Sequence, residues 1–359
     1  MQKITNPGML TSSDATRIST RLTEIDALRG VAAIAVVLFH YTTRYMELYK
    51  FDGAPTLSFP LGHYGVNLFF IISGFVIFMT LEKTRRPLDF VVSRFSRLFP
   101  VFWVSIFITF AVTHALGLPG KLVEFGSAVA NMLMFHNLLR VPHVDGVYWT
   151  LEVELLFYCG MFFLFRIGKL GRIHEALLAL MLLRVAYFVM EQAFGISLPW
   201  LVYRLLILSS IPWFAIGISI YLATSRNEPG AWKAPARTAA VAILTLLLTG
   251  SATLATLGLL FGLAVFCAAT ARLRWLRGGV FVWLGAISYP LYLIHENVGW
   301  SLQLQLVARG VPTDWIIVVT LLASLVLATL LHRAVEKPAM SWIRSRYLQR
   351  QPPKLAATP

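Results

Sequence analysis

Long apolar runs, each about the length of a membrane-spanning helix, recur along the chain from Ala27 almost to the C-terminus. A transmembrane helix needs about 20 mostly apolar residues. The pattern therefore predicts an all-α polytopic membrane protein with about ten transmembrane helices. We place them near residues 28–46, 63–81, 98–117, 148–166, 174–191, 200–222, 237–250, 253–271, 280–304 and 314–334.

The seventh and eighth of these spans come from one long stretch without charges. It runs from Thr238 to Ala271, 34 residues, and only Thr249-Gly250-Ser251 interrupts it. Arg237 and Arg272 flank the two ends. If both ends follow the positive-inside tendency, the stretch enters the membrane and returns as a hairpin.

Composition and charge support this topology and exclude a nucleic-acid partner. Charged residues make up 13% of the chain, against about 25% in a soluble domain. The net charge is +14, but with a cytoplasmic N-terminus 24 of the 31 Lys and Arg residues fall on the cytoplasmic side, five outside and two within spans. The basic excess therefore encodes orientation, with added attraction to anionic lipids. It predicts that the N- and C-termini are both cytoplasmic.

The same pattern divides the chain into three parts. We expect a polar cytoplasmic N-terminal tail over residues 1–24, a transmembrane domain over 25–338 and a basic cytoplasmic C-terminal tail over 339–359. Cys159 and Cys267 lie in apolar surroundings without metal-ligand spacing. We therefore expect neither a disulfide framework nor a metal site.

The first predicted span carries two ionisable side chains on one face. Arg29 and His40 are eleven residues apart, which at about 100° per residue brings them within about 20° of each other around the helix. They are separated by roughly 16 Å along the axis, at about 1.5 Å per residue. This spacing suits a long ligand with an anionic head and a reactive tail. The alternatives are that Arg29 extends to lipid phosphates and that His40 forms an interhelical hydrogen bond.

The second and third spans add an amide and two cations. Asn67 and Gly74 are seven residues apart and share a helix face, which offers a polar group and bare backbone to a ligand or to a closely packed neighbouring helix. Arg94 and Arg97 lie one turn apart where the third span enters the membrane. That geometry can grip phosphates, and the alternative is ordinary positive-inside flanking.

The fourth and ninth spans supply further candidates. Glu152 and Glu154 point about 200° apart on a helix, so only one faces a given cavity; we choose Glu154 and treat Glu152 as a helix-dipole residue. Trp149 is either a substrate contact or part of an interfacial aromatic belt. Tyr292 and His295 share one stripe, where a structural hydrogen bond is the alternative to a role in substrate binding.

Two further sets of ionisable residues have structural interpretations. His332 and Glu336, four residues apart near the end of the last span, most simply form an intrahelical pair. Arg184 and Arg204 lie within spans, and either can bind an anionic substrate or pair with acidic side chains.

Several short motifs resemble the acyltransferase-3 family of multispanning bacterial membrane O-acyltransferases. The matching pieces, which occur in the family's order, are Arg29 with His40, the block Gly65 to Phe75, Arg94-Phe-Ser-Arg97 before Pro100, Trp149-Thr-Leu-Glu-Val-Glu154, Ser288-Tyr-Pro-Leu-Tyr-Leu-Ile-His295 and Glu336-Lys-Pro338. They run over nearly the whole chain. The resemblance implies transfer of an acyl group, usually acetyl from acetyl-CoA, to a hydroxyl of a cell-surface carbohydrate such as an exopolysaccharide, an O-antigen or a lipid-linked oligosaccharide.

Joined to this implied activity, the residues suggest a mechanism. We expect Arg29, Arg94 and Arg97 to hold the phosphates of acyl-CoA at the cytoplasmic rim. His40 is the expected general base or transient acyl carrier. The remaining assignments follow the same scheme: Glu154 orients His40 or the sugar, Asn67 donates to the oxyanion, and Trp149, Tyr292 and His295 bind the acceptor.

The implied setting is the bacterial cytoplasmic (inner) membrane. We expect no permanently bound cofactor, acetyl-CoA as donor co-substrate, a carbohydrate acceptor, and contacts with membrane lipids and with other polysaccharide-assembly proteins. The alternative function is a secondary transporter of sugar or anion coupled to protons, because several spans with buried His, Glu and Arg also describe that class. A third possibility is a non-catalytic scaffold or flippase component of a polysaccharide machine.

Overall fold

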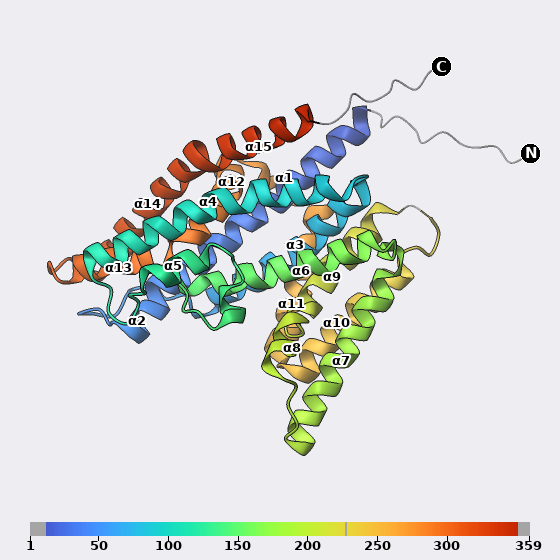
Figure 1. The fold of residues 1–359 in the computed structure, drawn as a ribbon, viewed down its shortest axis with the longest axis horizontal. Coiled ribbons are helices and arrows are strands. Elements are labelled where there is room, and N and C mark those ends of the chain that lie inside the picture. The colour runs from blue at the N-terminus through green and yellow to red at the C-terminus, as the bar shows by residue number, and fades with distance from the viewer. Residues whose placement is uncertain (1–11, 227, 351–359) are drawn as a thin grey trace, which may run out of the picture.

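The computed structural model describes residues 12–226 and 228–350, and every regular element in these two ranges is helical (Figure 1). The α-helices are α1 (Ser12–Leu38), α2 (Tyr45–Leu48), α3 (Gly65–Lys83), α4 (Pro87–Leu116), α5 (Phe125–Asn131), α6 (Trp149–Arg166), α7 (Ile173–Phe194), α8 (Trp200–Leu205), α9 (Ile211–Ser225), α10 (Lys233–Thr249), α11 (Ala252–Ala269), α12 (Gly279–Ile294), α13 (Glu296–Val307), α14 (Thr313–Leu331) and α15 (Lys337–Gln349). The predicted all-α class is confirmed for this part of the chain.

Short turns of other helix types join these elements. The 3₁₀ turns are η2 (Pro60–Tyr64), η3 (His136–Leu139), η4 (Gly146–Tyr148), η5 (Leu170–Arg172) and η6 (Arg274–Arg277). Two segments are π-helical: η1 (Phe39–Arg44) continues α1, and η7 (His332–Glu336) joins α14 to α15. π-Helical turns are rare and are frequent at functional sites. Here each of them carries a histidine that the sequence analysis singled out.

Within residues 12–226 and 228–350, seven helical stretches are long and apolar enough to cross a membrane, by length and composition. They are Thr23–Leu48, Pro60–Lys83, Pro87–Leu116, Gly146–Arg166, Leu170–Phe194, Ala252–Ala269 and Thr313–Gln349. Each corresponds to one predicted span. Two shorter apolar helices, α9 and α12, match parts of two others. The number ten and the cytoplasmic placement of the termini stay predictions.

Two predicted spans are broken in the structure, so the expectation of a single helix was wrong there. The stretch 200–222 forms α8 and α9, and at the break Ile207 has a φ of 43°. The stretch 280–304 forms α12 and α13, interrupted at His295. An apolar composition alone does not show such breaks, because the residues on both sides favour a helix equally well.

The predicted turn at Gly250-Ser251 is confirmed. Ser251 caps α11, where its hydroxyl accepts from the Leu254 N–H at 3.2 Å, as expected for a Ser N-cap. α10 and α11 pack against each other.

Glycines allow the central helices to cross closely. A Cβ on Gly30 of α1 would meet the Gly285 nitrogen of α12 at 2.6 Å, and one on Gly65 of α3 would meet the Ala32 carbonyl oxygen of α1 at 2.6 Å. α3 also crosses α9, where a Cβ on Gly74 would lie 2.3 Å from the Phe214 carbonyl oxygen. Of the two alternatives given for Gly74, the structure shows close packing against a neighbouring helix, and Gly65 packs in the same way.

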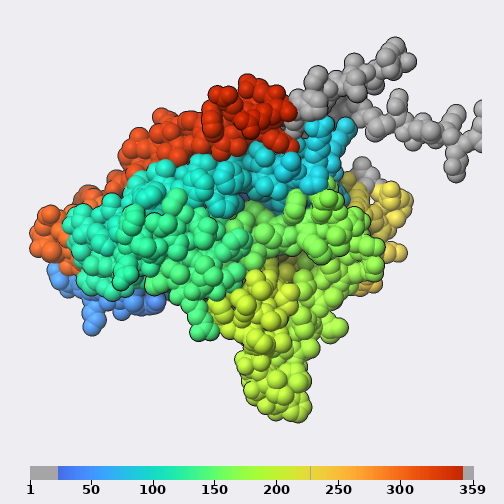
Figure 2. All heavy atoms as spheres, in the orientation of Figure 1, coloured from blue at the N-terminus to red at the C-terminus, as the bar shows by residue number. Residues whose placement is uncertain are grey.

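α1 lies in the middle of the main bundle, with α12 and α3 packed on it (Figure 1). A second group of helices, formed by α7, α8 and α10, projects from this bundle. α9 and α11 connect the two groups, because each packs against both α3 and α10. Figure 2 shows the projecting α7 end clearly separated from the rest of the surface. The candidate site residues lie in the main bundle.

The structure describes only part of the predicted tails. Residues 1–11 and 351–359 lie outside the described ranges. α1 begins at Ser12 and α15 ends at Gln349, so helix extends into both regions that the sequence analysis treated as tails.

Candidate active site

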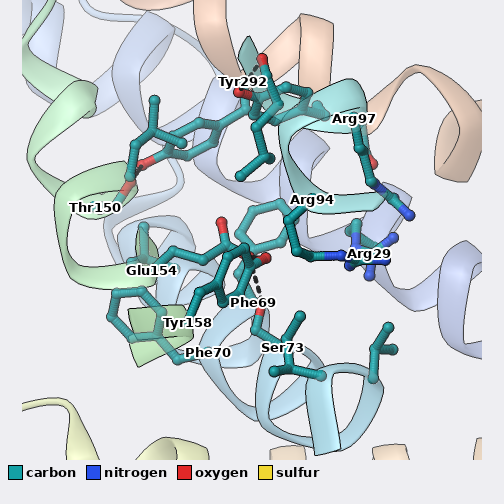
Figure 3. A pocket seen from close by; sticks show the side chains of 17 residues that line it. Arg29, Phe69, Phe70, Ser73, Arg94, Arg97, Thr150, Glu154, Tyr158 and Tyr292 are labelled. Carbon is teal, nitrogen blue, oxygen red and sulfur yellow. Dashed lines mark hydrogen bonds between the residues drawn. The ribbon is translucent and has the colours of Figure 1, made fainter. Parts of the chain in front are cut away.

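A cavity in the main bundle is lined by the three arginines that were predicted to bind phosphate, and we call it the arginine pocket. It contains about 690 Å³ of empty space, including its open mouth. Its lining residues are Arg29, Val66, Phe69, Phe70, Ser73, Val76, Ile77, Arg94, Arg97, Leu98, Thr150, Leu151, Glu154, Tyr158, Ser288, Tyr289 and Tyr292 (Figure 3). They come from α1, α3, α4, α6 and α12.

The three arginines approach the pocket from two helices. Arg29 comes from α1, and Arg94 and Arg97 lie one turn apart on α4 (Figure 3). Arg29 donates to the Asp26 carboxylate at 2.8 Å. No carboxylate of the described residues lies within 4 Å of the guanidinium of Arg94 or Arg97. Arg94 also has a buried Nε without an acceptor among these residues. Half-buried cations without a salt bridge among the described residues fit an anionic ligand.

Glu154 lies in the same pocket, opposite the arginines. Its Oε1 accepts from the Ser73 hydroxyl at 2.6 Å and from the hydroxyl of Tyr158. Figure 3 shows the three side chains converging. Glu154 was predicted to orient either His40 or the sugar. The carboxylate that lies within 4 Å of His40 among the described residues is that of Glu296, and the role toward the sugar stays a prediction.

Tyr292 stands where the arginine pocket ends. Its hydroxyl shares a hydrogen bond of 2.8 Å with the Thr150 hydroxyl. On its other side, the Tyr292 ring lies 5.5 Å from the His295 ring, centroid to centroid. Tyr292 therefore separates the arginine pocket from a second polar cluster and contacts both.

That second group, the histidine cluster, consists of His40, His295 and Glu296. His40 Nδ1 lies 2.8 Å from the Val36 carbonyl oxygen and 3.3 Å from His295 Nε2. His40 Nε2 lies 3.5 Å from Glu296 Oε2. His295 and Glu296 are 0% and 5% exposed. The structure thus joins His40 and His295, two residues predicted from distant spans.

The surrounding acceptors assign the protons on both imidazoles. His295 Nδ1 lies 2.8 Å from the Tyr292 carbonyl oxygen, so it carries a proton and leaves Nε2 as an acceptor. His40 Nδ1 faces the Val36 carbonyl and His295 Nε2, both acceptors, so it also carries a proton. His40 Nε2 is then the unprotonated nitrogen in the neutral ring. A general base needs such a nitrogen.

Aromatic and charged side chains enclose His40. The Trp300 indole N–H donates to the His40 carbonyl oxygen at 2.9 Å. Lys121 Nζ lies 5.2 Å from the centre of the Trp300 ring and 3.7 Å from Glu296 Oε1. Lys121 belongs to the segment between α4 and α5, so a non-helical connection completes the cluster.

The sequence analysis missed Glu296 and Lys121. Glu296 directly follows His295 in an otherwise apolar stretch, and a carboxylate within a span is itself a functional signal. Lys121 carries no such signal, because a lysine in a connection between spans is common. Its proximity to Glu296 depends on the path of that connection.

Two predicted site residues lie outside both groups. Asn67 is half-buried on α3, next to the pocket residue Val66, but the structure gives it no hydrogen bond to any described residue of either group. Trp149 is 40% exposed, and its ring lies 6.5 Å from that of the pocket residue Phe70.

The other ionisable residues have structural partners. Arg204 Nε donates to the fully buried Glu152 at 2.7 Å, so Glu152 is an ion-pair residue and not only a helix-dipole residue. Arg184 donates to the Tyr203 hydroxyl at 2.8 Å. The predicted intrahelical pair is confirmed, with His332 Nδ1 2.7 Å from Glu336 Oε2.

Comparison with known proteins gives two curated relatives. The chain is 28% identical over 134 residues to the "Exopolysaccharide production protein ExoZ" of Rhizobium meliloti (strain 1021), a match that covers 34% of this chain and 42% of that protein. It is 28% identical over 146 residues to the acyltransferase MdmB of Streptomyces mycarofaciens, covering 38% of each chain. The match spans less than half the length of either relative. No solved structure matches the chain.

A family model identifies the family of this chain. The model described as an acyltransferase domain, that of the acyltransferase-3 family, matches residues 22–333, most of the chain. This match favours an enzyme over the transporter alternative, and the apolar helices agree with a multi-pass membrane protein. The chain therefore belongs to the acyltransferase-3 family.

Proposed function

We propose that this protein is a membrane O-acyltransferase that moves an acyl group, acetyl in the first instance, from acyl-CoA to a hydroxyl of an exported carbohydrate. The observation that carries the proposal is the arrangement of two unlike sites around Tyr292. A pocket with three arginines lies on one side, and a buried imidazole with a free ring nitrogen lies on the other.

The arginine pocket is the proposed donor site. Coenzyme A carries several phosphates, and guanidinium groups bind phosphate oxygens through charge-assisted hydrogen bonds. Arg94 and Arg97 lack carboxylate partners among the described residues, so a phosphate competes with no internal salt bridge there. The thioester end then points along the pocket toward Tyr292 and His40.

His40 is the proposed general base. Nε2 takes the proton of the acceptor hydroxyl as the hydroxyl oxygen forms a bond to the thioester carbonyl carbon. The carbon–sulfur bond then breaks, and the proton passes from the imidazolium to the departing thiolate. The products are the O-acyl carbohydrate and free coenzyme A, and atoms and charges balance.

The acceptor and the setting complete the proposal. The name of the relative ExoZ refers to exopolysaccharide production, which supports a surface polysaccharide or its precursor as acceptor. Trp149, with its exposed ring, and Asn67 remain candidates for contacts to the acceptor. We place the protein in the bacterial cytoplasmic membrane with both termini cytoplasmic, where acyl-CoA is available, and expect contacts with lipids and with other polysaccharide-assembly proteins.

Radiolabelled acetyl-CoA tests the function directly. Purified protein in detergent or vesicles is incubated with the labelled donor and with candidate glycans, and label in the glycan fraction is measured. Base-labile label on the glycan is the expected result. Unmodified labelled solute that accumulates inside vesicles contradicts the proposal and supports transport instead.

A further inference from the structure

Glu296 lies beside His40, but the proposed reaction assigns it no role. Its carboxylate is buried between two cationic or potentially cationic groups, with Oε2 3.5 Å from His40 Nε2 and Oε1 3.7 Å from Lys121 Nζ. Only 6% of the side chain is exposed. A carboxylate buried this deeply is costly unless it is paired.

The distance between Glu296 Oε2 and His40 Nε2 indicates how this carboxylate acts on the imidazole. A separation of 3.5 Å exceeds the 2.7–3.2 Å of an ordinary N–H···O hydrogen bond. Nε2 of the neutral ring therefore keeps its lone pair free for the acceptor hydroxyl. Once Nε2 gains a proton, the same carboxylate lies next to a full positive charge in a site of low polarity, where the attraction is strong.

The fold fixes the carboxylate in this place. Glu296 is the first residue of α13, where the helix dipole favours a negative charge. The backbone N–H of Asn297 donates to Asp145 Oδ2 at 3.0 Å, which ties the start of α13 to the segment before α6. Gly146 leaves the necessary room, because a Cβ there would lie 2.3 Å from Glu296 Oε1.

We propose that Glu296 is a positioning residue for His40, which orients Nε2 toward the acceptor hydroxyl and stabilises the imidazolium formed when that hydroxyl loses its proton. The inference rests on the proposed function. Glu296 itself exchanges no proton in the step. The proton moves from the acceptor oxygen to His40 Nε2 and then to the sulfur of coenzyme A.

The other charged or titratable groups that act on this pair come from five places. His295 lies at the junction of α12 and α13, Lys121 in the connection after α4, and Asp145 before η4. Arg44 of η1 and His63 of η2 also act on His40 electrostatically. Lys121 and Arg44 oppose the effect of Glu296 on an imidazolium, so the carboxylate is the group that favours its formation.

Steady-state kinetics of Glu296→Gln test the proposal. We expect kcat to fall about 10- to 100-fold with KM for acyl-CoA unchanged. We also expect the acid-side midpoint of the kcat/KM profile to move to lower pH by about one unit, because a nearby opposite charge shifts such equilibria by about 1–3 units. Glu296→Asp keeps the charge and should restore the midpoint and part of kcat.

Two matched controls separate this role from a structural one. Glu336→Gln removes the carboxylate of the other buried His–Glu pair and should leave the acid midpoint unchanged. Gly146→Ala displaces the Glu296 carboxylate without altering it and should move the midpoint in the same direction as Glu296→Gln, whereas Gly160→Ala, at a position with open space, should not. Gly146→Ala also tests the proposal if Glu296→Gln does not fold.

The outcomes distinguish this inference from the proposed function. A fall in kcat with no movement of the midpoint, or no rescue by Glu296→Asp, overturns the positioning role. The same holds if Glu296→Gln has normal kinetics while His40→Ala is inactive. If the unmodified protein transfers no acyl group, or His40→Ala is fully active, the proposed function itself fails.

Discussion

The arginine pocket and the histidine cluster lie on opposite sides of Tyr292 and differ in how their charges are compensated. In the pocket, Arg94 and Arg97 meet no carboxylate within 4 Å among the described residues, although Glu154 lines the same cavity. In the cluster, His40 Nδ1 and both ring nitrogens of His295 have hydrogen-bond partners, whereas His40 Nε2 lies 3.5 Å from Glu296 Oε2 and keeps its lone pair free. A cation without a salt bridge is suited to bind a charged ligand, and a hydrogen-bonded imidazole is suited to hold its free nitrogen in one orientation.

This difference predicts that variants of the two regions change different kinetic constants. Variants in the cluster should lower kcat, and variants in the pocket should raise KM for the donor.

The largest expected effect is that of His40→Ala. Loss of the general base should lower kcat by about 10³-fold, within the usual range for such groups, with KM for acyl-CoA nearly unchanged. Label transfer at saturating donor measures this, and a KM effect without a kcat effect would contradict the comparison.

Arg94→Gln should have the next largest effect, on the donor. A charge-assisted contact contributes about 1.5–3 kcal/mol, so KM for acyl-CoA should rise about 10- to 100-fold while kcat changes little. The matched control is Arg85→Gln, which removes an exposed cation just before α4. Equal effects of the two variants on KM would show that general positive charge, and not the pocket, attracts the donor.

Glu154→Gln sharpens the comparison, because the sequence placed Glu154 with the catalytic group and the structure places it with the arginines. Loss of the only carboxylate lining the pocket among the described residues should lower the unfolding free energy by about 1–3 kcal/mol. Added coenzyme A should then raise the unfolding temperature more than in the unmodified protein, since its phosphates replace the missing charge. A thousandfold loss of kcat at unchanged stability would instead make Glu154 catalytic.

The smallest expected effect is on the pH dependence of stability. It comes from a histidine pair that belongs to neither the arginine pocket nor the histidine cluster. His136 Nε2 lies 2.6 Å from His143 Nδ1 in the connection between α5 and α6. Burial lowers the pKa of His136 to about 4 and also lowers the pKa of His143. In the unfolded chain the pKa is about 6.5.

Between pH 6.5 and 4 the unfolded chain therefore binds more protons, and stability should fall as the pH is lowered through this window. Above it the pair has no effect. Thermal unfolding in detergent at pH 7.5 and 5 measures the slope, which His136→Asn should flatten. The acid midpoint of activity should not respond to this variant, and a shift there would link the pair to the histidine cluster.

The sequence predicted most residues of the two regions, but it did not predict which of them lie next to each other. Helix periodicity placed Arg29 and His40 on one face of the first predicted span. In the structure Arg29 lies in α1 and lines the pocket, and His40 lies in η1 and belongs to the cluster. The cations Arg94 and Arg97 were also found, since a one-turn spacing at the start of a span is visible without a structure. These features are local, and a local spacing is fixed by helix geometry.

The partners of His40 were harder to predict. Glu296 and Lys121 reach His40 only because α12 ends at Ile294, a new helix begins at Glu296, and the connection after α4 places Lys121 over the Trp300 ring. Such contacts depend on how helices pack, which no residue spacing encodes. The same reason explains why Glu152 was taken for a dipole residue, since its partner Arg204 lies 52 positions away on α8.

The central claim is that the arginine pocket binds the donor and the histidine cluster carries out the transfer. The most direct test is equilibrium binding of coenzyme A to His40→Ala and Arg94→Gln, measured beside acyl transfer by the same preparations. The account predicts that His40→Ala binds coenzyme A with the affinity of the unmodified protein yet transfers label about 10³-fold more slowly. Arg94→Gln should bind at least about tenfold more weakly and still transfer label at high donor concentration. Loss of coenzyme A binding in His40→Ala, or unchanged binding in Arg94→Gln, would contradict it.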